Sequence, residues 1–199
     1  MIARCAALGE EHGFAQWIAA GQMLAGWARL ERGDARQALA EIRRSLETME
    51  KTGAHLWVQF TRYLLASALL ATGEIDEAAA VIEHELLRLA ATSGRWYEAE
   101  FHRLRGNVQR MRGDLAAAEA CYGSAIVVAE RQGALLWQLR AENDLASLRD
   151  AQGRTDEVRA RLAPLYASLG QDVASRDLAV TRTLLGDTGK KGNGKGRRG

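Results

Sequence analysis

The sequence contains little proline, cysteine or histidine: one, two and four residues respectively in a chain of 199. Scarce proline, together with abundant alanine, leucine, arginine and glutamate, favours helices throughout the chain. Cys5 and Cys121 are too few and too far apart for a disulfide framework or a cysteine-rich metal site. We therefore expect an all-α protein with reduced thiols and a cytoplasmic location.

Long apolar runs are also missing. Charged residues interrupt every window long enough to cross a bilayer, and Glu10 and Glu11 come too early for a secretory signal. The net charge is +2, but five of the 27 basic residues lie near the C-terminus, at Lys190, Lys191, Lys195, Arg197 and Arg198. We expect no membrane partner and a slightly acidic folded part followed by a basic tail.

Glycines are spaced regularly, at Gly13, Gly33, Gly53, Gly73, Gly94, Gly113, Gly133, Gly153 and Gly170. A glycine just past a helix end can adopt the left-handed conformation that closes the last turn. The spacing predicts four helix pairs, at 13–52, 53–93, 94–132 and 133–169. It also predicts a partial helix of a preceding repeat at 1–12, a capping helix at 170–185, and a disordered basic tail at 186–199.

Small and large residues occupy fixed positions in these pairs. The first helix of each pair carries Gly26, Ala66, Gly106 or Ala146, and the second carries Ile42, Ile82, Tyr122 or Leu162. A small residue lets two helices approach closely, and a large one fills the space beside it. Asp34 and Asp114 directly follow their glycines and are predicted helix caps, with Gln37 completing a capping box at Asp34.

One pair resembles a known repeat family. Gly106, Gly113-Asp114, Ala118, Tyr122 and Ala125 resemble the tetratricopeptide signature, and the other pairs match it more loosely over roughly 13–169. The forty-residue period exceeds the usual ~34, and no proline ends each repeat. HEAT-type repeats share the longer period but do not predict the glycine positions. The resemblance implies a right-handed α-solenoid of about four ~40-residue helical hairpins with a C-terminal capping helix.

A second, narrower resemblance rests on Trp96-Tyr97-Glu98-Ala99-Glu100, His102-Arg103-Leu104-Arg105-Gly106, Ala120-Cys121-Tyr122, Arg131-Gln132-Gly133-Ala134, Leu139-Arg140-Ala141, Gln152-Gly153-Arg154 and Leu162-Ala163-Pro164-Leu165-Tyr166. These segments look like the C-terminal helical region of bacterial signalling proteins in which a class III nucleotide cyclase domain and a STAND-type ATPase precede the repeats. Similar arrays follow the ATPase of MalT-like transcription regulators. The resemblance implies the regulatory arm of such a protein, or a fragment from one.

No set of residues indicates catalysis. The segment from Gly189 to Lys195 has the spacing of a phosphate-binding loop, but Gly196 replaces the serine or threonine and no strand precedes it. Histidines are scattered, and Glu83-His84-Glu85 lacks a second histidine one turn away. We expect a non-enzymatic protein without cofactor or metal. The tail is a solvated terminus or gives weak, salt-sensitive contact with nucleic acid.

The tetratricopeptide resemblance assigns the surface of the first helices to a concave groove. The residues selected are Ala20, Met23, Trp27, Leu30, Phe60, Tyr63, Ser67, Leu70, Glu100, Arg103, Asn107, Arg110, Arg140, Asn143, Ser147 and Asp150. Equivalent residues of adjacent pairs are expected side by side. The groove is then apolar in its N-terminal half and polar in its C-terminal half.

The residues in each half of this groove either stabilise the fold or bind a ligand. Glu100 with Arg140, and Arg110 with Asp150, are expected to form exposed salt bridges of little energy. Arg103, Asn107 and Asn143 would then lack an internal partner, and Arg103 and Asn107 suit a bound carboxylate. The alternative is a solvated surface. For Trp27, Phe60 and Tyr63 we expect core packing, and anchoring of a partner is the alternative.

These observations lead to two functional hypotheses. The first is a protein–protein interaction or scaffolding module that holds a protein, a peptide or a neighbouring domain in the groove. The second is a sensor that binds a small effector in the same groove, as the resemblance to MalT-like regulators implies.

Overall fold

The computed structural model describes residues 9, 11, 14–53, 57–92, 94–169 and 176–186. Within them every regular element is a helix, so the predicted all-α fold is confirmed. The helices are α2 (Ala15–Glu31), α3 (Ala35–Thr52), α4 (Val58–Thr72), α5 (Ile75–Ala90), α6 (Glu98–Met111), α7 (Leu115–Gln132), α8 (Leu135–Asp150), α9 (Thr155–Ser168) and α10 (Arg176–Leu184). The segments predicted at 1–12 and 186–199 lie outside the described residues, apart from Gly9, Glu11 and Gly186.

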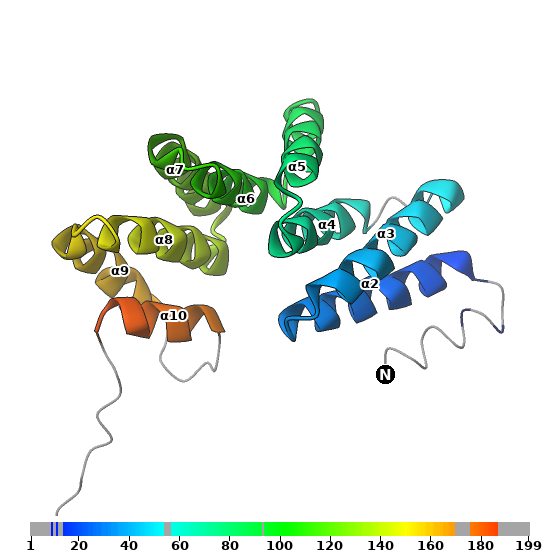
Figure 1. Ribbon diagram of the computed structural model, residues 1–199, viewed down its shortest axis with the longest axis horizontal. Coiled ribbons are helices and arrows are strands. Elements are labelled where there is room, and N and C mark those ends of the chain that lie inside the picture. The colour runs from blue at the N-terminus through cyan, green and yellow to red at the C-terminus, as the bar shows by residue number, and fades with distance from the viewer. Residues whose placement is uncertain are drawn as a thin grey trace, which may run out of the picture.

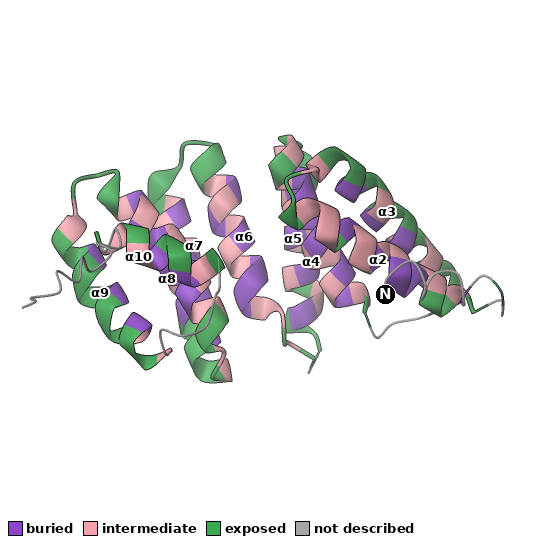
Figure 2. Ribbon diagram, turned by 90° about the horizontal axis from the view of Figure 1, so that it is seen from below, coloured by how far each residue is buried: buried purple, intermediate pink, exposed green. Residues whose placement is uncertain are grey.

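The helices follow one another in chain order around an arc, from α2 at one end to α10 at the other (Figure 1). Along the arc α2 contacts α4, α4 contacts α6, α6 contacts α8, and α8 contacts α10. Among the described residues α3, α5, α7 and α9 make no backbone contacts of this kind with one another, although the side chains of Arg43 in α3 and Glu77 in α5 form an ion pair at 2.7 Å. Buried and exposed residues alternate along each helix, as expected for helices with one face against their neighbours (Figure 2).

Most of the regularly spaced glycines adopt the predicted left-handed conformation. The φ angles lie between 64° and 84° at Gly33, Gly53, Gly73, Gly113, Gly133 and Gly153. Gly94 differs, because α5 has already ended at Ala90 and Ala91 caps it in the right-handed conformation. Gly13 and Gly170 lie outside the described residues.

The predicted helix caps have different outcomes. Asp114 accepts a hydrogen bond from the backbone amide of Ala117 at 2.9 Å, as expected at a helix start. The capping box predicted at Asp34 and Gln37 is wrong. Both of these side chains instead accept hydrogen bonds from the guanidinium of Arg29, at 3.4 Å and 2.6 Å.

The predicted contact between small and large residues is present in the structure. A Cβ atom added to Gly106 would lie 2.4 Å from Cε1 of Tyr122, and one added to Gly26 would lie 2.6 Å from Cγ1 of Ile42. Carbon atoms that are not bonded to each other do not approach so closely. Glycine at these two positions therefore lets the paired helices come close enough for the large side chains to fill the core.

Helix α10 packs against α8 and α9. Leu178 is buried in a cluster with Val158 and Leu162 of α9, and Leu184 packs against the edge of that cluster. Thr181 is also buried, and its hydroxyl donates a hydrogen bond to Oδ1 of Asn143 at 2.9 Å. The helix therefore shields apolar side chains of α8 and α9 from water.

We expect Gly106→Ala to lower the free energy of unfolding by about 1–3 kcal/mol, because Tyr122 or its helix must move to make room. Gly123→Ala is the matched control. Gly123 lies inside α7 with nothing within 4 Å of its Cβ position, so alanine there stabilises the helix by about 0.5–1 kcal/mol. Urea unfolding followed by circular dichroism measures both changes. Stabilisation by both substitutions would contradict the close contact.

Candidate ligand-binding groove

A groove of about 880 Å³ lies among α2, α4, α6, α8 and α10, which supply most of its lining residues. Two of its surfaces differ in chemistry. The aromatic wall consists of Trp27, Phe60, Tyr63, Tyr97 and Trp137. The polar wall consists of Arg103, Asn107, Arg140, Asn143, Asp144 and Asp177.

The rings of the aromatic wall form a continuous row. Trp27 and Phe60 lie edge to face with centroids 6.2 Å apart, and the Phe60 ring lies 5.4 Å from that of Tyr97. The Tyr97 ring in turn lies 5.1 Å from Tyr63 and 5.1 Å from Trp137. Aromatic side chains from α2, α4, the turn before α6, and α8 therefore meet in one surface.

The three aromatic residues singled out in the sequence belong to this wall, and their burial differs. Phe60 and Tyr63 pack against the core cluster of α2, α3 and α4, in agreement with the core-packing interpretation. Trp27 is 44% exposed although it contacts Phe60. Tryptophan is enriched at protein interfaces, and Trp27 is the exposed tryptophan that lines the groove in the described residues.

The polar wall is organised around Glu100, which is fully buried at the start of α6. Its carboxylate accepts hydrogen bonds from Nε of Arg103 at 2.8 Å and from Arg140 at 3.3 Å. The Glu100–Arg140 contact predicted from the sequence is confirmed, but the pair is not exposed as expected. Burial alone would raise the pKa of Glu100. The charges of the two arginines and a hydrogen bond from Tyr63 outweigh burial, so the pKa lies below its ordinary value.

Both arginines also bind a second carboxylate. Arg103 donates to Oδ2 of Asp144 at 2.9 Å, and Arg140 donates from Nε to Oδ2 of Asp177 at 2.9 Å. The expectation that Arg103 lacks an internal partner is therefore wrong. The side chain of Arg103 projects from α6 and reaches the carboxylate of Glu100 on its own helix and that of Asp144 on α8.

The two asparagines also have partners inside the protein. Oδ1 of Asn107 accepts a hydrogen bond from the Tyr122 hydroxyl at 2.7 Å. Asn143 donates to the backbone oxygen of Asp177 at 3.0 Å and accepts from Thr181. Of the donor pair proposed for a carboxylate ligand, Arg103 is therefore engaged by the fold, whereas the hydrogen bond of Asn107 uses its oxygen, which is an acceptor.

Six of the sixteen residues assigned to the groove from the sequence do not line it in the described structure, namely Ala20, Met23, Glu100, Arg110, Ser147 and Asp150. Three of them, Ala20, Met23 and Glu100, are buried instead. The Ser147 hydroxyl donates to the backbone oxygen of Asn143 at 2.8 Å. The ion pair expected between Arg110 and Asp150 does not form among the described residues. Asp150 instead accepts a hydrogen bond from the Thr155 hydroxyl at 2.9 Å, which ties the end of α8 to the start of α9.

Four residues of the aromatic and polar walls were missed in the sequence, although three of them carried a signal. Trp137 and Tyr97 belong to the series of aromatic residues that recurs near the start of each first helix. Asp144 follows Arg140 by one helical turn, a spacing typical of paired charges. Asp177 belongs to α10, where the repeat pattern has ended, so no equivalent position in another pair could indicate it.

The burial of the aromatic and polar walls affects two tyrosine hydroxyls. Burial, reinforced by the charge of Glu100, raises the pKa of Tyr97 to about 12 and also raises the pKa of Tyr63. Both hydroxyls are therefore neutral at physiological pH. Tyr63 uses its proton to hydrogen-bond to Glu100.

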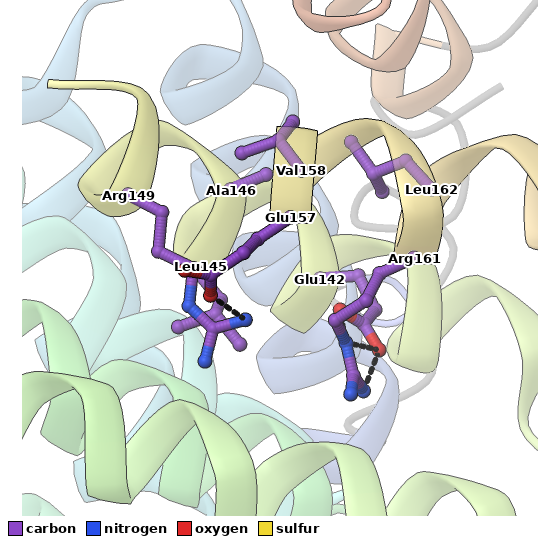
Figure 3. Close-up of a pocket in the computed structure, with 8 residues that line it drawn as sticks. All are labelled: Glu142, Leu145, Ala146, Arg149, Glu157, Val158, Arg161 and Leu162. Atoms are coloured by element: carbon purple, nitrogen blue, oxygen red, sulfur yellow. Dashed lines mark hydrogen bonds and ion pairs between the residues drawn. The ribbon is translucent and has the colours of Figure 1, made fainter. Parts of the chain in front are cut away.

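A second hollow lies between α8 and α9 (Figure 3). Apolar side chains such as Leu145 and Val158 line it together with charged ones, including the Glu142–Arg161 ion pair. The packed side chains leave no space for a water-sized molecule. This hollow is part of the contact between the two helices and offers no room for a ligand.

Other kinds of site have little support in the described residues. No group of three or more histidine, cysteine, aspartate or glutamate side chains there is placed to hold a metal ion. Burial lowers the pKa of His102, which favours its neutral form. Among the helices of the described residues, each is too short or too polar to cross a lipid bilayer.

Neither a comparison with models of protein families nor a comparison with curated proteins gives a match for this chain. The resemblances to tetratricopeptide repeats and to bacterial cyclase and ATPase regulators therefore stay predictions from the sequence. The groove is the feature on which a functional proposal depends.

We expect Glu100→Gln to lower the free energy of unfolding at pH 7 by about 3–5 kcal/mol, because it removes one partner of a buried ionic network. The Glu100 pKa is lower in the folded state, so its carboxylate stabilises the protein above pH 4.5. This contribution is lost as the pH falls through the lower folded-state value, so the variant should show a weaker acid-induced loss of stability. Urea titrations at several pH values measure both effects.

Glu77→Gln is the matched control for this experiment. Glu77 accepts a hydrogen bond from Arg43 at 2.7 Å on the protein surface. An exposed pair of this kind contributes less than about 1 kcal/mol. Equal effects of the two substitutions would contradict the central position of Glu100.

Proposed function

We propose that the chain is a non-enzymatic interaction module that holds an extended segment of a protein or peptide in its groove. The observation that carries this proposal is the aromatic wall, a row of contacting rings along a groove of about 880 Å³. Aromatic side chains supply much of the binding energy in protein interfaces, because they bury a large area with few rotatable bonds. A groove with residues from five successive inner helices in its lining suits a chain segment.

The finer architecture belongs to the same proposal. We infer a right-handed α-solenoid of about four tetratricopeptide-like hairpins with α10 as its cap. Supporting this are the recurring left-handed glycines and the repeated contacts between small and large residues, of which Gly106 with Tyr122 is the closest. On the sequence resemblance alone, we propose a cytoplasmic bacterial signalling role, as the regulatory arm of a cyclase or ATPase protein or a fragment from one.

A small effector is the second candidate occupant of the groove. The polar wall favours it, because a compact ligand with hydroxyl or amide groups could exchange hydrogen bonds with side chains such as Asp144 and Asn107. A small ligand would be recognised by thermal stabilisation in a compound screen, whereas a protein or peptide partner would be recovered in a peptide selection.

We expect Trp27→Ala to weaken binding of peptides selected from a random library against the full chain by about tenfold or more. The ring lines the groove and is partly exposed, so its loss removes contact area while most of the core stays intact. Fluorescence anisotropy with labelled peptides measures the affinity.

Leu87→Ala is the matched control, because Leu87 is a large apolar residue exposed on α5 and outside the groove. It should leave the affinity within about twofold. Selected peptides that bind both variants as tightly as the original chain would rule out the groove as their site.

A further inference from the structure

Carboxylates outnumber guanidinium groups at the groove by one. The ionic network of the polar wall contains Glu100, Asp144 and Asp177 together with Arg103 and Arg140. Glu31 and Arg176, which also line the groove, form an exposed pair at 3.8 Å and leave this difference unchanged. The formal charge of these seven residues is therefore −1.

Asp144 is the carboxylate through which a ligand can reach this excess charge. Its side chain lines the groove and is about one-quarter exposed, with a relative accessibility of 26%. Oδ2 accepts the hydrogen bond from Arg103, and no hydrogen bond to Oδ1 is found among the described residues. A donor that enters the groove could thus pair with Oδ1 without displacing Arg103.

The aromatic wall is the second feature that favours a cation. Ring faces attract cations, and the guanidinium group of arginine also stacks on them. The cation–π contact found among the described residues places the guanidinium of Arg182 6.0 Å from the ring centroid of Tyr166. Tyr166 does not line the groove. Within the described part of the chain, no cation of the protein therefore covers Trp27, Tyr97 or Trp137, and Trp27 is the most exposed of these rings.

We propose that the groove selects a basic peptide segment, with an arginine side chain stacked on the aromatic wall and hydrogen-bonded to Asp144. The inference rests on the proposed function, in which the groove holds a peptide, and it names the chemistry of that peptide. Arginine fits better than lysine, because its planar group can stack and donate hydrogen bonds at the same time. The chemistry is the opposite of the acidic ligand expected from Arg103 and Asn107, since Arg103 is already neutralised by two carboxylates.

The test begins with a random dodecapeptide library selected against the full chain. We expect arginine to be enriched among the bound peptides, more than lysine, and aspartate and glutamate to be depleted. In the tightest peptide, replacement of the enriched arginine by glutamate should weaken binding by about tenfold or more. Replacement by lysine should have a smaller effect.

Two substitutions in the protein locate the arginine. Asp144→Asn should weaken the arginine peptide by about tenfold, whereas Asp150→Asn, on the same helix but outside the groove, should leave its affinity within about twofold. Trp137→Leu removes the ring but keeps an apolar side chain. This substitution should weaken binding of the arginine peptide more than binding of the same peptide with leucine in place of that arginine. Trp137→Leu keeps the test valid if Asp144→Asn perturbs the fold.

The outcomes separate this inference from the proposed function. Acidic or uncharged peptides that lose affinity with Trp27→Ala would overturn the basic-peptide inference and leave the interaction module intact. If arginine peptides bind Asp144→Asn and Trp137→Leu with unchanged affinity but lose affinity for Trp27→Ala, the contacts assigned to the arginine are wrong. Peptides insensitive to all groove variants, or no enriched peptide at all, would overturn both proposals.

Discussion

The close approach of α6 and α7 at Gly106 and Tyr122 is the contact on which the groove depends. The absence of a side chain at Gly106 lets the Tyr122 ring lie against the α6 backbone. The hydroxyl of the same tyrosine then reaches Asn107, a residue of the polar wall. One side chain therefore fills the core and positions a groove residue, so the spacing of the two helices and the shape of the binding surface are set together.

The ionic network extends this coupling across the helices. Glu100 gathers Arg103 from its own helix and Arg140 from α8, and Arg140 in turn holds Asp177 on α10. Buried charges of this kind tolerate little displacement, because an unpaired one has a high desolvation cost. The polar wall is thus preorganised by interactions that belong to the fold, and a ligand meets charges whose positions are already fixed.

The sequence was sufficient for the all-helical fold and for most of the left-handed glycines, but not for the chemistry of the groove. Glycine positions and the Gly106–Tyr122 pair are local signals that recur with the repeat, so they could be found in one chain. The guanidinium of Arg103 is paired with two carboxylates, and one of them lies 41 residues away in the sequence, on another helix. Asp177 lies beyond the repeat pattern altogether. Such contacts depend on how helices cross, which spacing along the chain does not specify.

On the outer side of the arc, α3, α5, α7 and α9 make no backbone contacts with one another in the described residues. An exposed ion pair, between Arg43 of α3 and Glu77 of α5 at 2.7 Å, links two of them there. The inner helices are joined by packed apolar side chains, as in the cluster that Ala66 of α4 shares with Phe101 and Leu104 of α6. Because an exposed ion pair contributes less than about 1 kcal/mol, the packing on the inner side sets the curvature of the arc.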